Sequence, residues 1–241
     1  MKSSLRLFAA LVLALAGAAP ALAQEAESKA SQPWMKLEKE LGLQTTYSVD
    51  MVMQAMGMNV NSRTVRDGGK TRTEMTMPFM NLRMIALEIP ENGRTATYTL
   101  FPDKKKYVRE DDSDADASAA MPTIEDLGTE TYEGEDCVKR RISMTEQGIA
   151  TDLIMLFSPQ QKNMPVKMTI AANASLGEGQ PAMPIQSVVL FKNYDFSTPD
   201  AALFAVPADY AQAASVQEVM MEGMDLGALM QQMQQLMPTE E

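Results

Sequence analysis

The chain has 241 residues, with 21 lysines and arginines, 32 aspartates and glutamates and no histidine, so its formal net charge is −11. This acidic balance repels nucleic acid, and we expect no nucleic-acid partner. The absence of histidine excludes Ser-His-Asp and Cys-His triads and histidine-based zinc sites. No other catalytic group of residues stands out, so we predict a protein that is not an enzyme and that needs no cofactor.

The first 23 residues have the pattern of a cleavable secretory signal peptide. Lys2 and Arg6 supply a basic start, residues 7–15 form an unbroken apolar run, and small residues lead up to Ala23. The run is shorter than the roughly 20 apolar residues of a membrane-spanning helix, and no later segment reaches that length. We therefore predict cleavage before Gln24, a periplasmic or secreted location, and no stable membrane insertion. Loss of the two basic residues makes the net charge of the mature chain −13.

A short amphipathic helix is predicted after the cleavage site. Trp34, Leu37 and Leu41 recur at helical spacing, and Gly42 supplies a stop. From Thr45 onward the apolar period changes to two, which is typical of a half-buried strand. The sequence therefore places a helix immediately before a β-rich domain.

Alternating strands separated by turn sequences follow this first strand. Turns are predicted at 67–69, 91–93 and 102–103, where glycine, asparagine, aspartate and proline gather. Such a run of short strands is typical of a meander of antiparallel hairpins, in which successive strands are neighbours.

Residues 109–120 interrupt the strand patterns. The segment is rich in aspartate and glutamate and has no apolar side chain larger than alanine. We interpret it as a mobile surface loop. A calcium site is an alternative because oxygen ligands are abundant, although the segment lacks the glycine and the spacing of the known calcium loop.

Strand patterns resume after this loop over 128–132, 137–144 and 149–157, and again from Pro165 and over 185–191. Roughly ten strands in succession favour one large antiparallel sheet that curls on itself. We predict a mainly β domain over 24–210, an incomplete barrel that is covered by an N-terminal and a C-terminal helix. The lone Cys137 cannot form an internal disulfide, and we expect it to be a small buried apolar side chain.

The tail over 211–241 is predicted to be a methionine-rich helix. Its apolar residues recur at i, i+4, i+7 and i+11, and they are Leu226, Met230, Met233 and Met237. Gly223 and Gly227 each weaken this helix by about 1 kcal/mol relative to alanine, so it needs a partner surface. The helix either docks on the open face of its own domain or serves as a lid or partner-binding helix.

Three stretches of the chain resemble LolA-like exported proteins, which share the fold of outer-membrane lipoprotein-sorting proteins, and in particular a group of secreted domains with that fold. They are 93–107, with a charged turn before a tyrosine, 131–140 around Cys137, and 164–210, which ends in Leu-Phe-Ala-Val-Pro-Ala-Asp-Tyr. The resemblance implies an incomplete barrel whose apolar concavity holds, in that family, the acyl chains of lipoproteins in transit. The residues with which the family docks on its receptors cannot be matched to positions in this sequence.

Methionine is the outlier of the composition, with 22 residues, whereas aromatic residues make up only 6%. Methionines at strand alternation belong on an interior face, and their flexible thioethers suit a cavity with varied guests. The residues expected to line the apolar concavity are Tyr47, Val49, Met51, Met53, Met75, Met77 and Met84. We predict a binding or carrier protein for an apolar ligand such as an acyl chain or a lipoprotein lipid. An envelope structural or interaction protein, with a protein partner and no small-molecule ligand, is the alternative.

Thioethers also select Cu(I), so copper binding is a further alternative. Among the methionine groups, only Met220, Met221 and Met224 lie off the predicted sheet, and no histidine or cysteine accompanies them. We predict no metal site.

Overall fold

The computed structural model describes residues 38–55, 58–77, 82–91, 94–111, 122–146, 149–174 and 183–222. The predicted signal peptide, most of the predicted N-terminal helix and most of the acidic segment lie outside these residues. So do Leu226, Met230, Met233 and Met237 of the predicted C-terminal helix.

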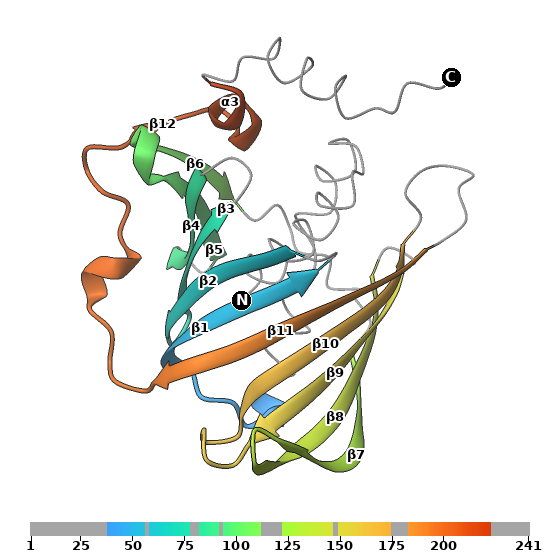
Figure 1. Cartoon of the computed structure of the whole chain (residues 1–241). Coiled ribbons are helices and arrows are strands. Elements are labelled where there is room, and N and C mark those ends of the chain that lie inside the picture. The colour runs from blue at the N-terminus through green and yellow to red at the C-terminus, as the bar shows by residue number, and fades with distance from the viewer. Residues whose placement is uncertain are drawn as a thin grey trace, which may run out of the picture.

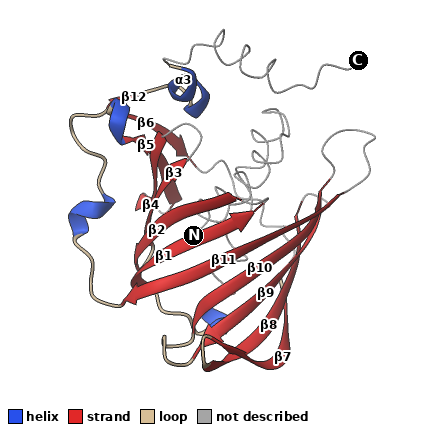
Figure 2. Cartoon of the chain, in the orientation of Figure 1, coloured by secondary structure: helices blue, strands red, loops and turns tan. Residues whose placement is uncertain are grey.

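Strands make up most of the described chain (Figure 2). In chain order they are β1 Thr46–Ala55, β2 Met58–Asp67, β3 Lys70–Met77, β4 Leu82–Glu91, β5 Arg94–Phe101, β6 Lys106–Asp111, β7 Thr123–Tyr132, β8 Glu135–Glu146, β9 Ile149–Ser158, β10 Met164–Ala174, β11 Met183–Asp195 and β12 Ala211–Gln212. The helical elements are the 3₁₀-helices η1 Pro102–Lys104 and η2 Ala201–Phe204, the α-helix α3 Val216–Met221 and a turn of helix over 38–41.

All the strands belong to one sheet in the order β12-β6-β5-β4-β3-β2-β1-β11-β10-β9-β8-β7. Two antiparallel meanders, β1 to β6 and β7 to β11, meet where β1 pairs with β11. The sheet is curved, so that β6 and β7 stand on opposite sides of β1 and β11 (Figure 1). The predicted mainly β fold with one large curved antiparallel sheet is therefore confirmed. Within the described chain, no helix combines the length and the apolar character needed to cross a bilayer.

The N-terminal turn of helix ends where the sequence predicts. Gly42 has a positive φ of 65°, and the backbone amides of Gly42 and Leu43 donate to the carbonyls of Lys39 and Glu38 at 3.2 and 3.0 Å. These two bonds form the glycine-based motif that closes many helices, because glycine adopts the left-handed conformation without strain. The turn places Leu41 among the buried residues of the sheet's inner side.

The segment after β11 crosses the outer side of the sheet. We name residues 196–210 the strap, which includes η2 (Figure 1). Arg72 of β3 donates to the carbonyl of Leu203 at 2.9 Å, and Val206 and Tyr210 pack against a buried cluster on β4 and β5. The strap therefore covers the outer face of the β3–β6 half of the sheet.

A helix is predicted from residue 211, but the structure has a short strand there and the helix begins later. Ala211 and Gln212 form β12, which pairs parallel with β6, and α3 starts at Val216. The amides of Ala211 and Ala213 donate to the carbonyls of Lys105 and Tyr107 at 2.9 and 2.8 Å. These residues extend the sheet because the open edge of β6 satisfies their backbone groups, which a helix starting at 211 would leave unpaired.

Candidate functional site

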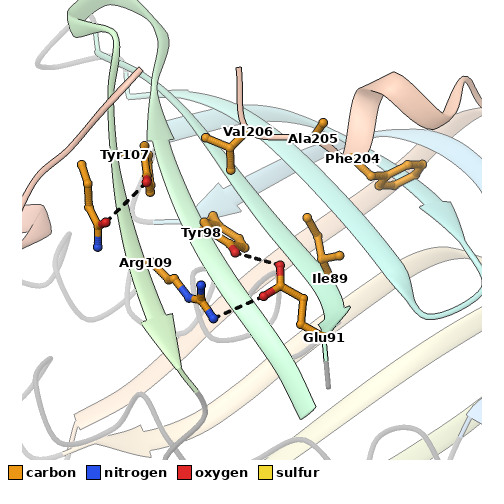
Figure 3. Close-up of a pocket in the computed structure, with 9 residues that line it drawn as sticks. Ile89, Glu91, Tyr98, Tyr107, Arg109, Phe204, Ala205 and Val206 are labelled. Carbon is orange, nitrogen blue, oxygen red and sulfur yellow. Dashed lines mark hydrogen bonds and ion pairs between the residues drawn. The ribbon is translucent and has the colours of Figure 1, made fainter. Parts of the chain in front are cut away.

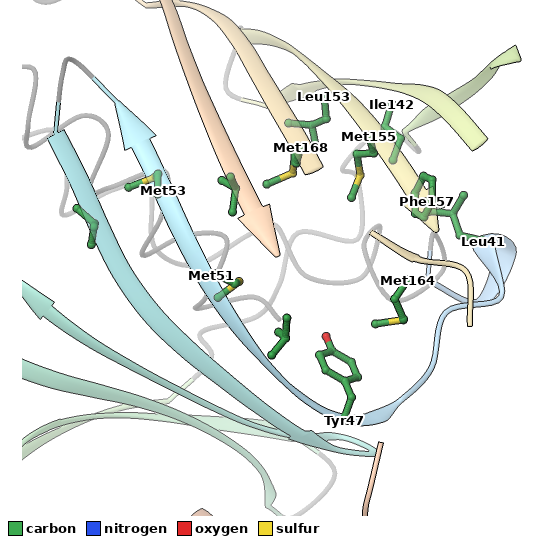
Figure 4. Close-up of a cluster of buried hydrophobic side chains, with 13 residues drawn as sticks. Leu41, Tyr47, Met51, Met53, Ile142, Leu153, Met155, Phe157, Met164 and Met168 are labelled. Carbon is green, nitrogen blue, oxygen red and sulfur yellow. The ribbon is translucent and has the colours of Figure 1, made fainter. Parts of the chain in front are cut away.

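The inner, concave side of the sheet carries a continuous apolar cluster (Figure 4). We name its buried residues the concave cluster: Leu41, Tyr47, Val49, Met51, Met53, Val60, Ile142, Leu153, Met155, Phe157, Met164, Met168 and Val189. The cluster forms because alternate residues of β1 point to one face, and the pairing of β1 with β11 joins that face to the second meander.

Methionines from three strands contribute to the concave cluster. One row of paired positions crosses four strands of the sheet. It consists of Met53 of β1, Val189 of β11, Met168 of β10 and Met155 of β9. With neighbouring strands about 4.8 Å apart, this row spans about 14 Å. Met164 also accepts a hydrogen bond on its sulfur from the backbone amide of Gln44 at 3.3 Å. The cluster is therefore a broad buried apolar layer that combines flexible side chains with a few rigid ones.

The seven residues predicted to line the concavity share one face but divide between two clusters. Tyr47, Val49, Met51 and Met53 lie in the concave cluster. Met75 and Met84, which are opposite each other on β3 and β4, lie in a second buried cluster with Phe101, Val108, Ala213 and Val219. Met77 is partly buried and packs against both. The helix α3 contributes Val219 to the second cluster, so the prediction that a C-terminal helix covers the inner face is confirmed for this part.

Sequence reasoning missed the residues that β8 to β10 contribute, such as Ile142, Leu153, Met155 and Met168. The sequence predicts strands over 137–144, over 149–157 and from Pro165, but the face that these residues share with β1 depends on the β1–β11 pairing between distant segments. The local pattern alone does not contain that information.

A polar row borders the apolar surface on the same face. Tyr47, Arg66, Thr71 and Glu88 occupy successive paired positions on β1, β2, β3 and β4, and all are buried. Arg66 forms a two-point ion pair with Glu38, with Nη2 to Oε2 at 2.7 Å. Burial raises the pKa of Tyr47, so its hydroxyl is neutral at physiological pH.

A row of hydroxyl groups lies between the polar row and the methionines. Thr64 of β2 and Thr73 of β3 are buried and paired, and their hydroxyl oxygens are 3.0 Å apart. Ser62 follows next on β2, between Met51 and Met75. Along β2 and β3, the concave face therefore carries charged side chains first, then hydroxyl groups, and then apolar side chains.

A groove of about 430 Å³ lies on the opposite face, between the strap and β4 to β6 (Figure 3). It is lined by Ile89, Glu91, Tyr98, Tyr107, Arg109, Phe204, Ala205, Val206 and Gln212. Glu91 accepts a hydrogen bond from the Tyr98 hydroxyl at 2.8 Å and pairs with Arg109 at 3.2 Å, and Arg109 lies over the Tyr98 ring. Burial, followed by the Glu91 hydrogen bond, raises the pKa of Tyr98. Glu91, Tyr98 and Arg109 therefore already engage one another within the groove.

Among the described residues, no three cysteine, aspartate or glutamate side chains are grouped so that they could hold a metal ion. Cys137 is buried, as expected, and burial raises the pKa of its thiol. Of the three methionines considered for copper, Met220 packs against the second buried cluster, and Met224 lies outside the described residues. Copper binding by these residues therefore stays an untested alternative to the prediction of no metal site.

No protein-family model matches the chain, and no curated protein matches it either. Solved structures do resemble it. An uncharacterized conserved protein from Thermus thermophilus is 14% identical over 76% of this chain and 98% of its own, with a TM-score of 0.49. The lipoprotein LppX from Mycobacterium tuberculosis is 9% identical over 70% of this chain and 99% of its own, with a TM-score of 0.36.

A domain from Vibrio parahaemolyticus assigned to outer membrane lipoprotein sorting is 10% identical over 77% of this chain and 96% of its own, with a TM-score of 0.32. The predicted resemblance to lipoprotein-sorting-like proteins is therefore confirmed.

Proposed function

We propose that this protein is an exported, non-enzymatic binding or carrier protein for an apolar ligand such as an acyl chain, with the concave face as its binding site. The observation that carries the proposal is the concave cluster, in which Met51, Met53, Met155, Met164 and Met168 converge on one curved surface. Unbranched thioether side chains repack around guests of different shape, which suits a carrier better than branched side chains would.

The energetics of such a site favour a long aliphatic guest. Each buried methylene group contributes about 0.8 kcal/mol, so a few methylenes of an acyl chain suffice for useful affinity. The polar and hydroxyl rows at one side of the cluster would orient the guest, because a hydrocarbon gains nothing from lying on them. The predicted signal peptide over residues 1–23 places this function in the periplasm or outside the cell.

A fluorescence titration of the mature chain, residues 24–241, with the neutral apolar probe N-phenyl-1-naphthylamine tests the proposal. We expect saturable binding that Ile170→Glu weakens at least tenfold, because a carboxylate in the apolar surface is costly to desolvate. Ile170 of β10 is half-buried and packs against the concave cluster.

The matched control is Ile154→Glu, because Ile154 of β9 is also half-buried but lies on the other face, opposite Thr169. It should leave the affinity for the probe within twofold of the wild type. Equal weakening by both substitutions would place the probe elsewhere. A wild-type protein that takes up no probe would refute the carrier function and favour the alternative of an envelope interaction protein that binds no small molecule.

A further inference from the structure

The two edges of the sheet differ. At one end, the short strand β12 pairs with β6 and covers part of that edge. At the other end, β7 is the last strand, and among the described residues no strand pairs with the side of β7 that faces away from β8. Because β7 is ten residues long, this side presents a row of backbone amides and carbonyls. The edge of β7 can therefore receive an added strand, as the edge of β6 does.

The turn between β7 and β8 indicates which backbone groups point into the open edge. Glu133 and Gly134 form a two-residue turn with φ values of 50° and 84°, the pattern of a type I′ hairpin. In such a hairpin the two flanking residues, here Tyr132 and Glu135, bond to each other, and the next residue along each strand points its backbone groups the other way. The backbone amide of Thr131 therefore points away from β8.

Two exposed carboxylates on β7 favour a basic strand. Glu125 and Glu130 have side chains that are 59% and 39% exposed, and they pair with Arg141 and Lys139 of β8 at 2.8 and 2.7 Å. Because Arg141 and Lys139 are two residues apart, both pairs lie on the same face of the sheet. Each cation contacts only Oε2, and within the described chain no hydrogen bond reaches Oε1 of either carboxylate. An added strand would find acceptors there for its lysine or arginine side chains.

The other face of β7 favours an apolar side chain. Ile124 lies opposite Ile142 of β8 and packs against the concave cluster. Side chains of a strand alternate between the two faces of a sheet. The strand that fits the β7 edge therefore alternates basic residues with apolar ones.

A second copy of β7 does not have this pattern. Antiparallel pairing of two β7 strands about their centre would place Glu125 of one copy opposite Glu130 of the other, and like charges at opposed positions are destabilising. The net charge of −13 on the mature chain also opposes self-association. The charges therefore favour a basic partner over a second copy.

We propose that the open edge of β7 is a docking site for an extended, basic segment of a partner protein, which joins the sheet as a strand and places lysine or arginine side chains beside Glu125 and Glu130. The irregular pairing between Asp126 and Thr129, together with the two carboxylates, hinders uncharged or acidic strands. The features that protect this edge thus also select the partner. The docking site is separate from the proposed site for an apolar ligand.

Fluorescence anisotropy with the labelled peptide acetyl-Lys-Val-Lys-Val-Lys-Val-Lys-amide and the mature chain, at physiological ionic strength, tests the proposal. The control peptide carries proline in place of each valine, so it has the same charge but lacks those amides and cannot extend a sheet. We expect saturable binding of the valine peptide at least tenfold tighter than that of the proline peptide. Bound valine peptide should also protect the Thr131 amide from hydrogen exchange.

Variants locate the bound peptide. Glu125→Gln combined with Glu130→Gln should weaken the valine peptide at least tenfold. The matched control is Asp209→Asn combined with Glu222→Gln, which removes the same charge from two exposed carboxylates that pair with lysines beside β6. It should leave the affinity within threefold of the wild type. Thr131→Pro should abolish binding, because it removes the outward amide.

Several outcomes would overturn the proposal. They are a wild-type chain that does not bind the valine peptide, equal binding of the proline peptide, and equal weakening by the two double variants. A wild-type chain that sediments as a dimer, and a Thr131→Pro variant that sediments as a monomer, would assign the edge to a second copy instead. The titration with N-phenyl-1-naphthylamine decides the carrier function independently of these results.

Discussion

Arg66 of β2 and Glu38 of the N-terminal turn of helix form an ion pair whose side chains are only 8% and 6% exposed. Arg66 also donates from Nε to the carbonyl of Gly68 at 3.1 Å, so its guanidinium is fixed at the β2–β3 turn. The pair fastens the helical turn to the concave face and holds Leu41 in the concave cluster.

Glu38→Leu should lower the free energy of unfolding by about 3–5 kcal/mol, because it leaves a buried guanidinium without its carboxylate. Urea denaturation followed by circular dichroism measures this loss. The double variant Glu38→Leu with Arg66→Met should regain most of it, since two apolar side chains of similar volume often replace a buried pair without cost.

The exposed pair between Arg63 and Asp50, 2.8 Å apart, supplies the control for that experiment. Asp50→Asn should change the free energy of unfolding by at most about 1 kcal/mol, as is usual for surface ion pairs. A Glu38→Leu variant as stable as Asp50→Asn would show that the buried pair does not fasten the helix.

Replacing a buried serine by alanine should stabilise the protein where the hydroxyl has no hydrogen-bond partner and destabilise it where the hydroxyl has one. Ser62→Ala and Ser187→Ala should each raise the free energy of unfolding of the ligand-free protein by about 1 kcal/mol, because each removes a buried hydroxyl without a partner. Ser158 is equally buried, but its hydroxyl donates to the Glu135 carboxylate at 2.8 Å. Ser158→Ala should therefore lower stability by about 1–3 kcal/mol. Denaturation of all three variants measures the contrast, and a loss at Ser62 as large as that at Ser158 would show that Ser62 has a partner.

The alternation of the first meander was enough to predict which residues of β1 point inward. Tyr47, Val49, Met51 and Met53 are buried on one face, as their spacing indicated. A strand's own period of two determines its faces, and the turn sequences determine which neighbours pair.

Other features needed information that periodicity does not carry. The apolar pattern predicts a strand from Gly128, whereas β7 begins at Thr123. The earlier residues do not show the alternation, because the pairing with β8 is irregular between Asp126 and Thr129 and Gly128 has a φ of 81°. Such bulges hide a strand from a period-of-two test. The start of α3 was also missed, although serine followed three residues later by glutamate is a known signal for the start of a helix. The Ser215 hydroxyl accepts a hydrogen bond from the backbone amide of Glu218 at 3.1 Å.

The attachment of the end of the strap and of the chain that follows it should weaken in acid. Lys105 donates to Asp209 at 2.8 Å and Lys106 to Glu222 at 2.9 Å, and each hydrogen bond holds the pKa of the carboxyl below its ordinary value. A carboxyl whose folded pKa is lowered stabilises the fold above its ordinary pKa of about 4, and this contribution is lost as the pH falls through the lower folded value.

Hydrogen exchange measured from pH 6 down to pH 3 tests this expectation. After correction for the intrinsic rate, protection of the Ala211 and Ala213 amides, which bind β6, should fall before that of the β1 amides. A variant carrying both Asp209→Asn and Glu222→Gln should lose the pH dependence of this difference. Protection that falls together at both places, in the wild type and in the variant, would assign the acid sensitivity to other carboxylates.

Shortening the Met53 side chain measures how tightly the concave face is packed. Met53 has no exposed surface and faces Val60 and Val189 on the two neighbouring strands. Met53→Ala should lower the free energy of unfolding by about 2–5 kcal/mol, and Met53→Leu by less than about 1.5 kcal/mol, because the first leaves a cavity and the second nearly conserves volume. Met58, half-buried on the same face of β2, is the control, and Met58→Ala should have a smaller effect than Met53→Ala.

The same variant bears on ligand binding. N-phenyl-1-naphthylamine should recover more stability in Met53→Ala than in the wild type, since the added space lies in the proposed binding surface and a ligand stabilises the folded state in proportion to its affinity. Thermal denaturation with and without the probe measures the recovery. Equal shifts in both proteins would place Met53 in a structural core that the ligand does not reach, and the site would then have to lie nearer Met51 and Met75, beside Ser62.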